Sequence, residues 1–406
     1  MSLASSIKSL ALDHLPFIFA VLRNVMPNAV FKNTSVITRF DDVREALSVP
    51  NVLGVIYAEK MSIITDGSNF FLGMNDTPTY SRDVSNMRIV ARREDVSMIV
   101  VPFVEKAADA IVAQSNGKME IVSELTSVVP CLLSAEYLGV PGPSQQELFR
   151  WTSRMFQYLF YPGNPKEVDD DAVECGAQTR AYLDQLIAQR HQLIAAGQER
   201  DDVLGRCLAL QSTGIPGMTD ADIRNNLIGI IIGMMPTTSK CAVLVLDYLL
   251  DHPDLLASAQ QAAWDNDNET LRKYVLESLR FNSFGAGVVR EALTDYVIAK
   301  GTMRAAKIPK GARILVALQS AMLDGRVLDR PNTFRLDRPD YHYMHFGYGM
   351  HTCFGQHINM VQIPLIVKAL LKCKNLRRAS GKPGKVQYEQ PYPVRFHLEF
   401  DPPTLS

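Results

Sequence analysis

The ten residues Phe346-Gly-Tyr-Gly-Met-His-Thr-Cys-Phe-Gly355 carry most of the information about the fold of this chain of 406 residues. Glycines at positions 347, 349 and 355 frame one cysteine, Cys353, and permit tight turns and a close approach of the backbone. Such a loop can aim its amide groups at a thiolate sulfur while a large planar group lies against it. The stretch therefore predicts that Cys353 presents a thiolate to a metal.

The alternative is that Cys353 is a buried, inert thiol, which is a common state of free cysteine. That description suits Cys131, Cys207 and Cys241 better, because these three lie in apolar stretches that read as helices. The chain has 6 cysteines without paired spacing, which argues against a disulfide framework or a zinc site and favours a reducing compartment.

The string resembles the haem-binding loop of the cytochrome P-450 superfamily, F-x-x-G-x-H/R-x-C-x-G, at every defining position. The resemblance extends from about Val36 to Phe400. It implies a mainly α fold with a smaller β-rich portion, formed as one domain over residues 1–406. It also implies haem b (iron protoporphyrin IX), with Cys353 as the iron ligand and with Phe346, Gly347 and Gly355 in the cofactor-binding loop.

Composition sets broad limits on the function. Hydrophobic residues make up 47% of the chain and charged residues 21%, so a sizeable core can form, and a net charge of -1 gives no reason to expect nucleic acid as a partner. The most apolar N-terminal run, Leu15 to Leu22, is much shorter than the roughly 20 residues that span a bilayer. We therefore expect no membrane anchor and a cytoplasmic location, as in the soluble bacterial members of the family.

The order of predicted elements follows the same family. Residues 35–47 read as a short strand, a turn and a helix capped by Asp41 and Asp42, and a largely helical region follows from Asp76 to about Val203. The longest helix, capped by Thr219 or Asp220, extends to about Asp251 and is apolar almost all round, so we expect it at the centre of the protein. A helix around residue 277, strands within 288–316, a helix over 355–371 and a C-terminal hairpin are predicted beyond it.

Glu277 and Arg280 lie three residues apart on a predicted helix, where their side chains can pair. With Arg338, which follows in Phe334-Arg-Leu-Asp-Arg338, they match the E-x-x-R and F-x-x-x-R elements of the family. The resemblance implies a structural ion triad under the haem, in which none of the three residues is catalytic.

Further residues are assigned to the haem propionates by the resemblance. His351 and Arg290 match family partners of these carboxylates, although an ordinary exposed arginine is an equally good interpretation of Arg290 from the residues alone. A third family motif ends in histidine, with arginine four residues later, where this chain has Tyr80 and Val84. Tyr80 can still donate a hydrogen bond, and we expect Arg88 to replace the missing charge.

The largest departure from the family lies in the central helix at Gly233-Met-Met-Pro-Thr-Thr238. Thr237 matches the family's threonine, but Pro236 occupies the position of the acid that helps to deliver protons for cleavage of the O–O bond. Proline removes a backbone donor and kinks the helix, which frees a carbonyl near Ile232. Either Thr237 and a water still deliver protons, or the substrate already contains an O–O bond; in a third interpretation Pro236 only bends the helix.

The sequence predicts an oxidoreductase, a P-450-type monooxygenase that inserts oxygen from dioxygen into an apolar fatty acid, terpenoid or aromatic compound. The alternatives are a peroxide-dependent or hydroperoxide-rearranging enzyme and a non-enzymatic haem sensor or carrier. The segments expected over the haem are apolar, in line with an apolar substrate. The chain has a basic run from Lys372 to Lys385, in addition to Arg92 and Arg93. These residues form either a solvated surface or a docking site for an acidic ferredoxin, which together with its reductase would supply electrons.

Overall fold

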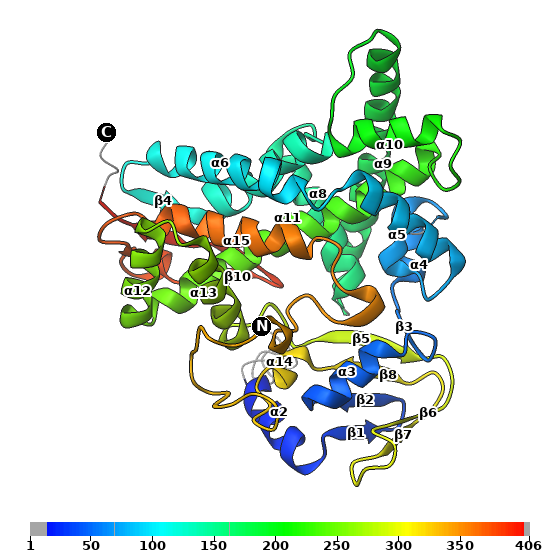
Figure 1. Ribbon diagram of the computed structural model, residues 1–406, viewed down its shortest axis with the longest axis vertical. Helices are drawn as coiled ribbons and strands as arrows, with labels where there is room; N and C mark the ends of the chain where they lie inside the picture. The colour runs from blue at the N-terminus through cyan, green and yellow to red at the C-terminus, as the bar shows by residue number, and fades with distance from the viewer. Residues whose placement is uncertain (1–13, 69, 162, 402–406) are drawn as a thin grey trace. The chain divides into compact units, whose positions relative to one another are not determined.

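The computed structural model describes residues 14–68, 70–161 and 163–401. The chain divides into two compact units, and each is made of two separate segments (Figure 1). Unit 1 takes the residues up to Ile56 and those from Leu276 to Phe354, whereas unit 2 takes Tyr57–Val275 and the residues from Gly355 onward. The helix α13, Asn268–Phe281, begins in unit 2 and ends in unit 1.

Unit 1 is built on a five-stranded sheet with the strand order β1-β2-β8-β5-β3. Its strands are β1 Asn28–Phe31, β2 Thr34–Ile37, β3 Leu53–Gly54, β5 Val288–Ala292 and β8 Arg313–Val316. The two segments meet where β2 pairs with β8 in parallel, with Ile37 opposite Val316. The unit also contains the hairpin of β6 Tyr296–Ile298 and β7 Ala306–Ile308 and the helices α2 Leu15–Val25, α3 Phe40–Ser48 and α14 Leu318–Ala321.

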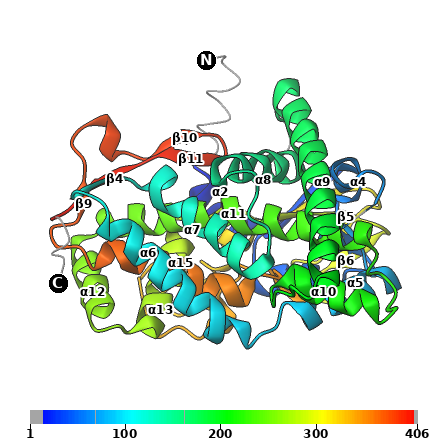
Figure 2. The same ribbon diagram turned by 90° about the horizontal axis from the view of Figure 1, so that it is seen from above.

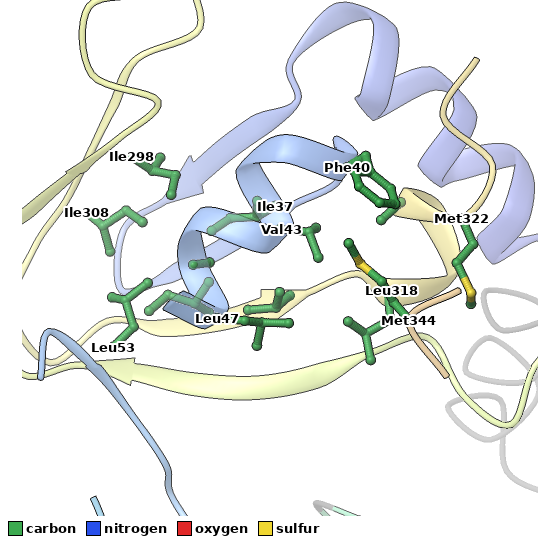
Figure 3. Close-up of a cluster of buried hydrophobic side chains, with 14 of the residues drawn as sticks. Ile37, Phe40, Val43, Leu47, Leu53, Ile298, Ile308, Leu318, Met322 and Met344 are labelled. Carbon is green, nitrogen blue, oxygen red and sulfur yellow. The ribbon is translucent and has the colours of Figure 1, made fainter. Parts of the chain in front are cut away.

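The core of unit 1 is an apolar cluster between α3 and the sheet (Figure 3). Phe40, Val43 and Leu47 project from α3 at helical spacing and are at most 5% exposed. The predicted capping of this helix by Asp41 and Asp42 is wrong, because both lie inside the first turn. Asp324 caps the helix instead, since its Oδ2 accepts the N–H of Phe40 at 3.2 Å.

Unit 2 is predominantly helical. Its helices are α4 Ala58–Thr65, α5 Pro78–Val90, α6 Val101–Ala113, α7 Val128–Leu133, α8 Gln145–Phe160, α9 Lys166–Ala195, α10 Val203–Ser212, α11 Asp220–Leu250, α12 Pro253–Trp264 and α15 Gln356–Leu371. A three-stranded sheet joins β4 Lys118–Glu120, β12 His397–Glu399 and β9 Arg377–Arg378, and β10 Gln387–Glu389 pairs with β11 Tyr392–Arg395. The C-terminal hairpin is confirmed. The region from Asp76 to about Val203 was predicted to be helical with breaks at 141–143, at 161–165 and near Gly197, and β4 is a strand where no break was predicted.

The helix α11 is the centre of unit 2, as its apolar sequence predicts, and it packs against α8, α9 and α15 (Figure 2). Thr219 and Asp222 form a capping box at its N-terminus, where Asp222 Oδ2 accepts the Thr219 N–H at 2.9 Å. Of the helices that the structure describes, α11 is long and apolar enough to cross a membrane, but 83% of that stretch is buried inside the protein. Such burial is the state of a core helix.

Candidate functional site

The cysteine loop lies in unit 1 up to Phe354 and is closed by its own backbone. The N–H of Cys353 donates to the carbonyl oxygen of Phe346 at 2.9 Å, and the N–H of Gly347 donates to Met344 at 3.1 Å. Gly347 has φ +75° and Gly349 has φ +72°, angles that side chains of L-residues rarely adopt. The two glycines let the chain fold back within a few residues and place Cys353 at the end of the turn.

Gly349 is also required by the space around it. A Cβ at this position would lie 2.5 Å from the carbonyl oxygen of Leu47, at the C-terminal end of α3. The neighbouring Tyr348 is held to the same helix, because Arg44 Nη2 donates to its hydroxyl at 3.2 Å and the guanidinium lies 5.1 Å from its ring centroid. The loop is therefore fixed to a helix of the core of unit 1.

The cysteines differ in their accessibility. Cys353 is half-buried, whereas Cys131 and Cys207 are at most 1% exposed. Burial raises the pKa of both buried thiols to about 12, which keeps them protonated and inert. Cys241 is also half-buried, although its apolar surroundings in the sequence favoured a buried position.

The predicted ion triad forms in unit 1 and is completely buried. Arg280 makes two parallel hydrogen bonds to Glu277, Nε to Oε1 at 2.9 Å and Nη2 to Oε2 at 2.8 Å, with both side chains at 0% exposure. Arg338 Nε lies 3.1 Å from Glu277 Oε1. Both arginines also donate to main-chain carbonyls, including that of Thr333. The triad is therefore a structural centre that ties α13 to the segment before the cysteine loop.

That segment is held directly by the same carboxylate. The Tyr343 hydroxyl donates to Glu277 Oε1 at 2.9 Å, and burial, reinforced by Glu277, raises the pKa of this phenol. A ring nitrogen of His345 lies 2.9 Å from the carbonyl oxygen of Leu276. Since Phe346 follows at once, these contacts determine where the cysteine loop begins.

Arg290 and His351, the predicted propionate partners, also lie in unit 1. Arg290 is on β5 and only 6% exposed, so its interpretation as an ordinary surface arginine is wrong. Its Nη1 donates to the carbonyl oxygen of Val289 at 3.0 Å. His351 is half-buried in the short turn Gly349–His351, two residues before Cys353. A buried guanidinium needs anionic or carbonyl partners, which a carboxylate can provide.

Tyr80 and Arg88 both lie on α5 in unit 2, eight residues apart. Tyr80 is 6% exposed, and burial raises its pKa while the Arg88 guanidinium opposes that rise. Arg88 is exposed, and together with Arg93 it lowers the pKa of His357, after burial as the first cause. Positive charge therefore gathers near the start of α15.

Gly355 is the residue before α15, and its carbonyl oxygen accepts the N–H of Asn359 at 2.9 Å. Its φ of -83° is available to any residue, so the backbone angle does not explain a glycine here. The sequence motif gives no sign that Gly355 differs in backbone angle from Gly347 and Gly349.

The departure in the central helix lies on α11 in unit 2. Pro236 is buried inside the helix and has no N–H, so the carbonyl of Ile232 receives no bond from it. The Thr237 hydroxyl donates to the carbonyl oxygen of Gly233 at 2.5 Å. Gly233, Thr237 and Cys241 are half-exposed on a helix that is otherwise mostly buried. Apart from the helix's own backbone and the two neighbouring residues, a Cβ built on Gly233 would meet no atom of the described residues within 4 Å. The structure thus leaves an open strip along one face of α11.

These residues fit a haem with one protein ligand. Among the residues that the structure describes, no three His, Cys, Asp or Glu side chains gather as a metal site. A single half-exposed thiol in a rigid turn suits a metal whose other ligands belong to the cofactor, as in haem-thiolate proteins. In unit 1, buried Arg290 and half-buried His351 are donors of the kind that propionates need. In unit 2, the buried phenol of Tyr80 is another donor of this kind.

The sequence profile described as Cytochrome P450 matches residues 144–391, which is more than half of the chain. The chain belongs to the cytochrome P450 family. It therefore carries a haem cofactor and the monooxygenase activity of that family, on a mainly α fold with a smaller β-rich portion.

Its relatives are distant. The chain is 25% identical to the cytochrome P450 monooxygenase PikC of Streptomyces venezuelae over 312 residues, which cover 77% of this chain and 69% of the relative. It is 24% identical to the mycinamicin VIII C21 methyl hydroxylase of Micromonospora griseorubida, covering 89% of this chain and 88% of that one.

Solved structures show the same fold. P450BioI, crystallised with an acyl carrier protein that carries hexadec-9Z-enoic acid, matches with a TM-score of 0.80 at 19% identity over 96% of this chain and all of the other (100%). CYP109E1 from Bacillus megaterium in complex with testosterone matches with a TM-score of 0.79 at 16% identity, covering 97% and 99% of the two chains.

Proposed function

We propose that this cytochrome P450 binds haem b through Cys353 and inserts oxygen from dioxygen into an apolar small molecule such as a fatty acid, terpenoid or aromatic compound. The observation that carries the proposal is the closed cysteine loop, with Cys353 N–H bonded to Phe346 and with the entering segment held by Glu277. We also propose that residues 1–406 act as one catalytic domain in the cytoplasm.

Each site residue has a defined task in this proposal. The Cys353 sulfur holds the iron, and Phe346, Gly347 and Gly355 shape the loop so that backbone amides can face that sulfur. Arg290, His351 and Tyr80 with Arg88 provide positive charge and donors for the two propionates. When bound, haem supplies the iron at which dioxygen is reduced and activated.

The proton supply has to differ from that of acid-containing relatives. The Thr237 hydroxyl donates to the carbonyl oxygen of Gly233. It can give up its proton on the side of α11 where oxygen insertion is proposed and take another proton from a water molecule. The carbonyl of Ile232, left without the N–H of residue 236, can accept a hydrogen bond from such a water. Thr237 and the carbonyl of Ile232 together offer a route that needs no carboxylate.

Electrons have to come from a separate protein, and we propose a ferredoxin with its reductase. Arg92 and Arg93 are exposed in unit 2, which also contains the basic run from Lys372 to Lys385. Positive surfaces of this kind attract acidic partners and speed their association.

A second candidate, a peroxide-dependent enzyme, is favoured by two observations: Pro236 stands where the acid would be, and the Thr237 hydroxyl is engaged by the Gly233 carbonyl. A haem sensor or carrier is the third candidate, and it would show no turnover. The names of two solved neighbours mention testosterone and hexadec-9Z-enoic acid, which are apolar molecules, and this supports an apolar substrate for the present chain.

The test uses isotopic oxygen and compounds selected by their ability to shift the haem spin state. Purified protein with ferredoxin, reductase and ¹⁸O₂ should yield product that contains ¹⁸O. The same protein with unlabelled peroxide and no electron donor should form little product. The reverse result would replace the monooxygenase proposal with the peroxide-dependent one, and absence of turnover under both conditions would favour the sensor.

A further inference from the structure

A lysine is buried in the apolar central helix of unit 2. Lys240 lies on α11, one turn beyond Pro236, and is 8% exposed. Its Nζ lies 3.4 Å from the hydroxyl of Tyr161 and 5.8 Å from the centroid of that ring. Burial lowers the pKa of the ammonium to about 8, although the neighbouring Cys241 acts in the opposite direction. A desolvated cation of this kind gains from an anion that comes within reach.

A half-buried phenol contacts this side chain, and a second, buried phenol packs beside the first. Tyr161 follows α8, and burial raises its pKa to about 12. Tyr392 lies on β11, with its ring centroid 6.5 Å from that of Tyr161, and it is 8% exposed. Among the residues that the structure describes, the buried hydroxyl of Tyr392 has no hydrogen-bond partner, which is rare for a polar group in a native protein and calls for an acceptor.

The walls of this cluster are aromatic. The ring of Phe156 lies 6.3 Å from the centroids of both Tyr161 and Tyr392. One cation, two phenolic donors and aromatic walls suit a small monoanion attached to an apolar body. A phosphate monoester carries more charge and more acceptor oxygens than one ammonium and two hydroxyls can satisfy.

Lys240 lies on α11 about one turn from Thr237, which belongs to the open strip of that helix. Lys240 follows Thr237 by three residues, which places it about one turn, or roughly 5 Å, further along the same side of the helix. Gly233 and Thr237 of that strip are half-exposed, and there is open space beside Gly233. A molecule held at Lys240 can therefore extend its apolar part along the strip toward Gly233.

We propose that Lys240, with the hydroxyls of Tyr161 and Tyr392, binds the carboxylate of an apolar carboxylic acid, which is the substrate class of this enzyme. The inference rests on the proposed function, in which the strip beside Thr237 faces the site of oxygen insertion. One carboxylate oxygen accepts from Lys240 Nζ, and the other accepts from Tyr392, which gives the buried hydroxyl its partner.

The first experiment compares matched pairs of compounds that differ only in charge. Dodecanoic acid, hexadecanoic acid and an apolar cyclic terpenoid acid are each titrated against their methyl esters, with Kd measured by isothermal titration calorimetry. At least one acid should bind roughly tenfold more tightly than its ester. Lys240→Met should abolish that difference by weakening the acid alone, and Tyr392→Phe should weaken it several-fold.

The matched control is Lys106→Met, which removes the same charge from an exposed position of α6 in the same unit. It should leave the Kd of both acid and ester unchanged. Haem content and melting temperature are measured for every variant, so that an unfolded protein is not mistaken for a binding defect.

The second experiment detects the ammonium itself. At pH 8 about half of the Lys240 side chains are protonated, and a bound carboxylate raises their pKa. Binding of the acid should therefore take up about half a proton, measured from the dependence of the binding enthalpy on the ionisation enthalpy of the buffer. The ester and the Lys240→Met variant should take up none.

Three results would overturn the proposal: no acid of the panel binds, every ester binds as tightly as its acid, or Lys240→Met weakens acid and ester equally. These readouts are binding constants and proton counts. They are separate from the oxygen-insertion test, so a peroxide-dependent enzyme could still bind acids at Lys240, and a monooxygenase could fail to do so.

Discussion

The strongest prediction on stability concerns Glu277. Replacing it with alanine removes a fully buried carboxylate that pairs with Arg280 and Arg338 and accepts the hydroxyl of Tyr343 at 2.9 Å and the N–H of Arg335 at 3.1 Å. Two guanidinium groups would then stay buried without their counter-ion. Because removal of one partner of a buried ion pair costs about 3 to 5 kcal/mol, Glu277→Ala should remove a large part of a stability of roughly 5 to 15 kcal/mol.

The chain contains a matched control on the same helix. Glu269 and Arg272 are also three residues apart on α13 and form an ion pair at 2.7 Å, but the Glu269 side chain is 62% exposed. Exposed pairs contribute about 0 to 1 kcal/mol, so Glu269→Ala should be nearly silent. The two variants remove the same group at the same spacing and differ in burial.

The assay is urea unfolding followed by circular dichroism, with the haem content of the purified protein measured in parallel. Glu277→Ala should unfold at a much lower urea concentration and retain little haem, because the segment before the cysteine loop loses its anchor. Glu277→Gln, which keeps the shape and removes the charge, should fall between. If Glu277→Ala lost less than about 1 kcal/mol, or no more than Glu269→Ala, the triad would not be a structural centre.

Three further predictions concern the site. Cys353→Ala should lose the red-shifted Soret band of the reduced, carbon monoxide-bound protein, and retention of that band would refute Cys353 as the ligand. Thr237→Ala should release hydrogen peroxide in place of product while peroxide-supported turnover persists; a silent variant would exclude Thr237 from proton delivery. Lys240→Met should raise the free energy of unfolding at pH 7 by up to about 3 kcal/mol, because the wild type keeps an ammonium whose pKa burial lowers from 10.5 to about 8. That gain should shrink as pH rises from about 8 to 10.5, where the unfolded chain also loses the proton, and a pH-independent gain in urea midpoint would contradict it.

Much of this molecule could be predicted from sequence because its signals are local or ordered. The apolar run from residue 220 onward predicts a central helix, and α11 is buried on most of its surface. Glu277, Arg280 and Arg338 were recognisable by their spacing and order, and the structure brings them into contact. The roles of the residues in the cysteine loop follow from the motif and stay predictions.

What could not be predicted depends on contacts between residues far apart in the chain. Asp324 caps α3 from a position remote in sequence, and no local pattern distinguishes it from Asp41 or Asp42. The cluster at Lys240 was missed for the same reason, since Tyr161 contacts Lys240 from the end of α8 and Tyr392 packs beside Tyr161 from the C-terminal hairpin. The sequence did offer one sign of this cluster, a lysine within an apolar helix. Lysine is almost never fully buried unless its ammonium group is paired.

The composition of unit 1 from two remote segments has a consequence for the synthesis of the protein. Strand β2 leaves the ribosome before its parallel partner β8, which pairs Val316 with Ile37. The partner is translated roughly 280 residues later, a delay of about 15 to 60 s at bacterial and eukaryotic elongation rates. During this interval the β1–β2 hairpin exposes an unpaired edge that is open to other nascent chains. We therefore expect productive expression to depend on chaperones that shield the edge of the β1–β2 hairpin until β8 has been synthesised.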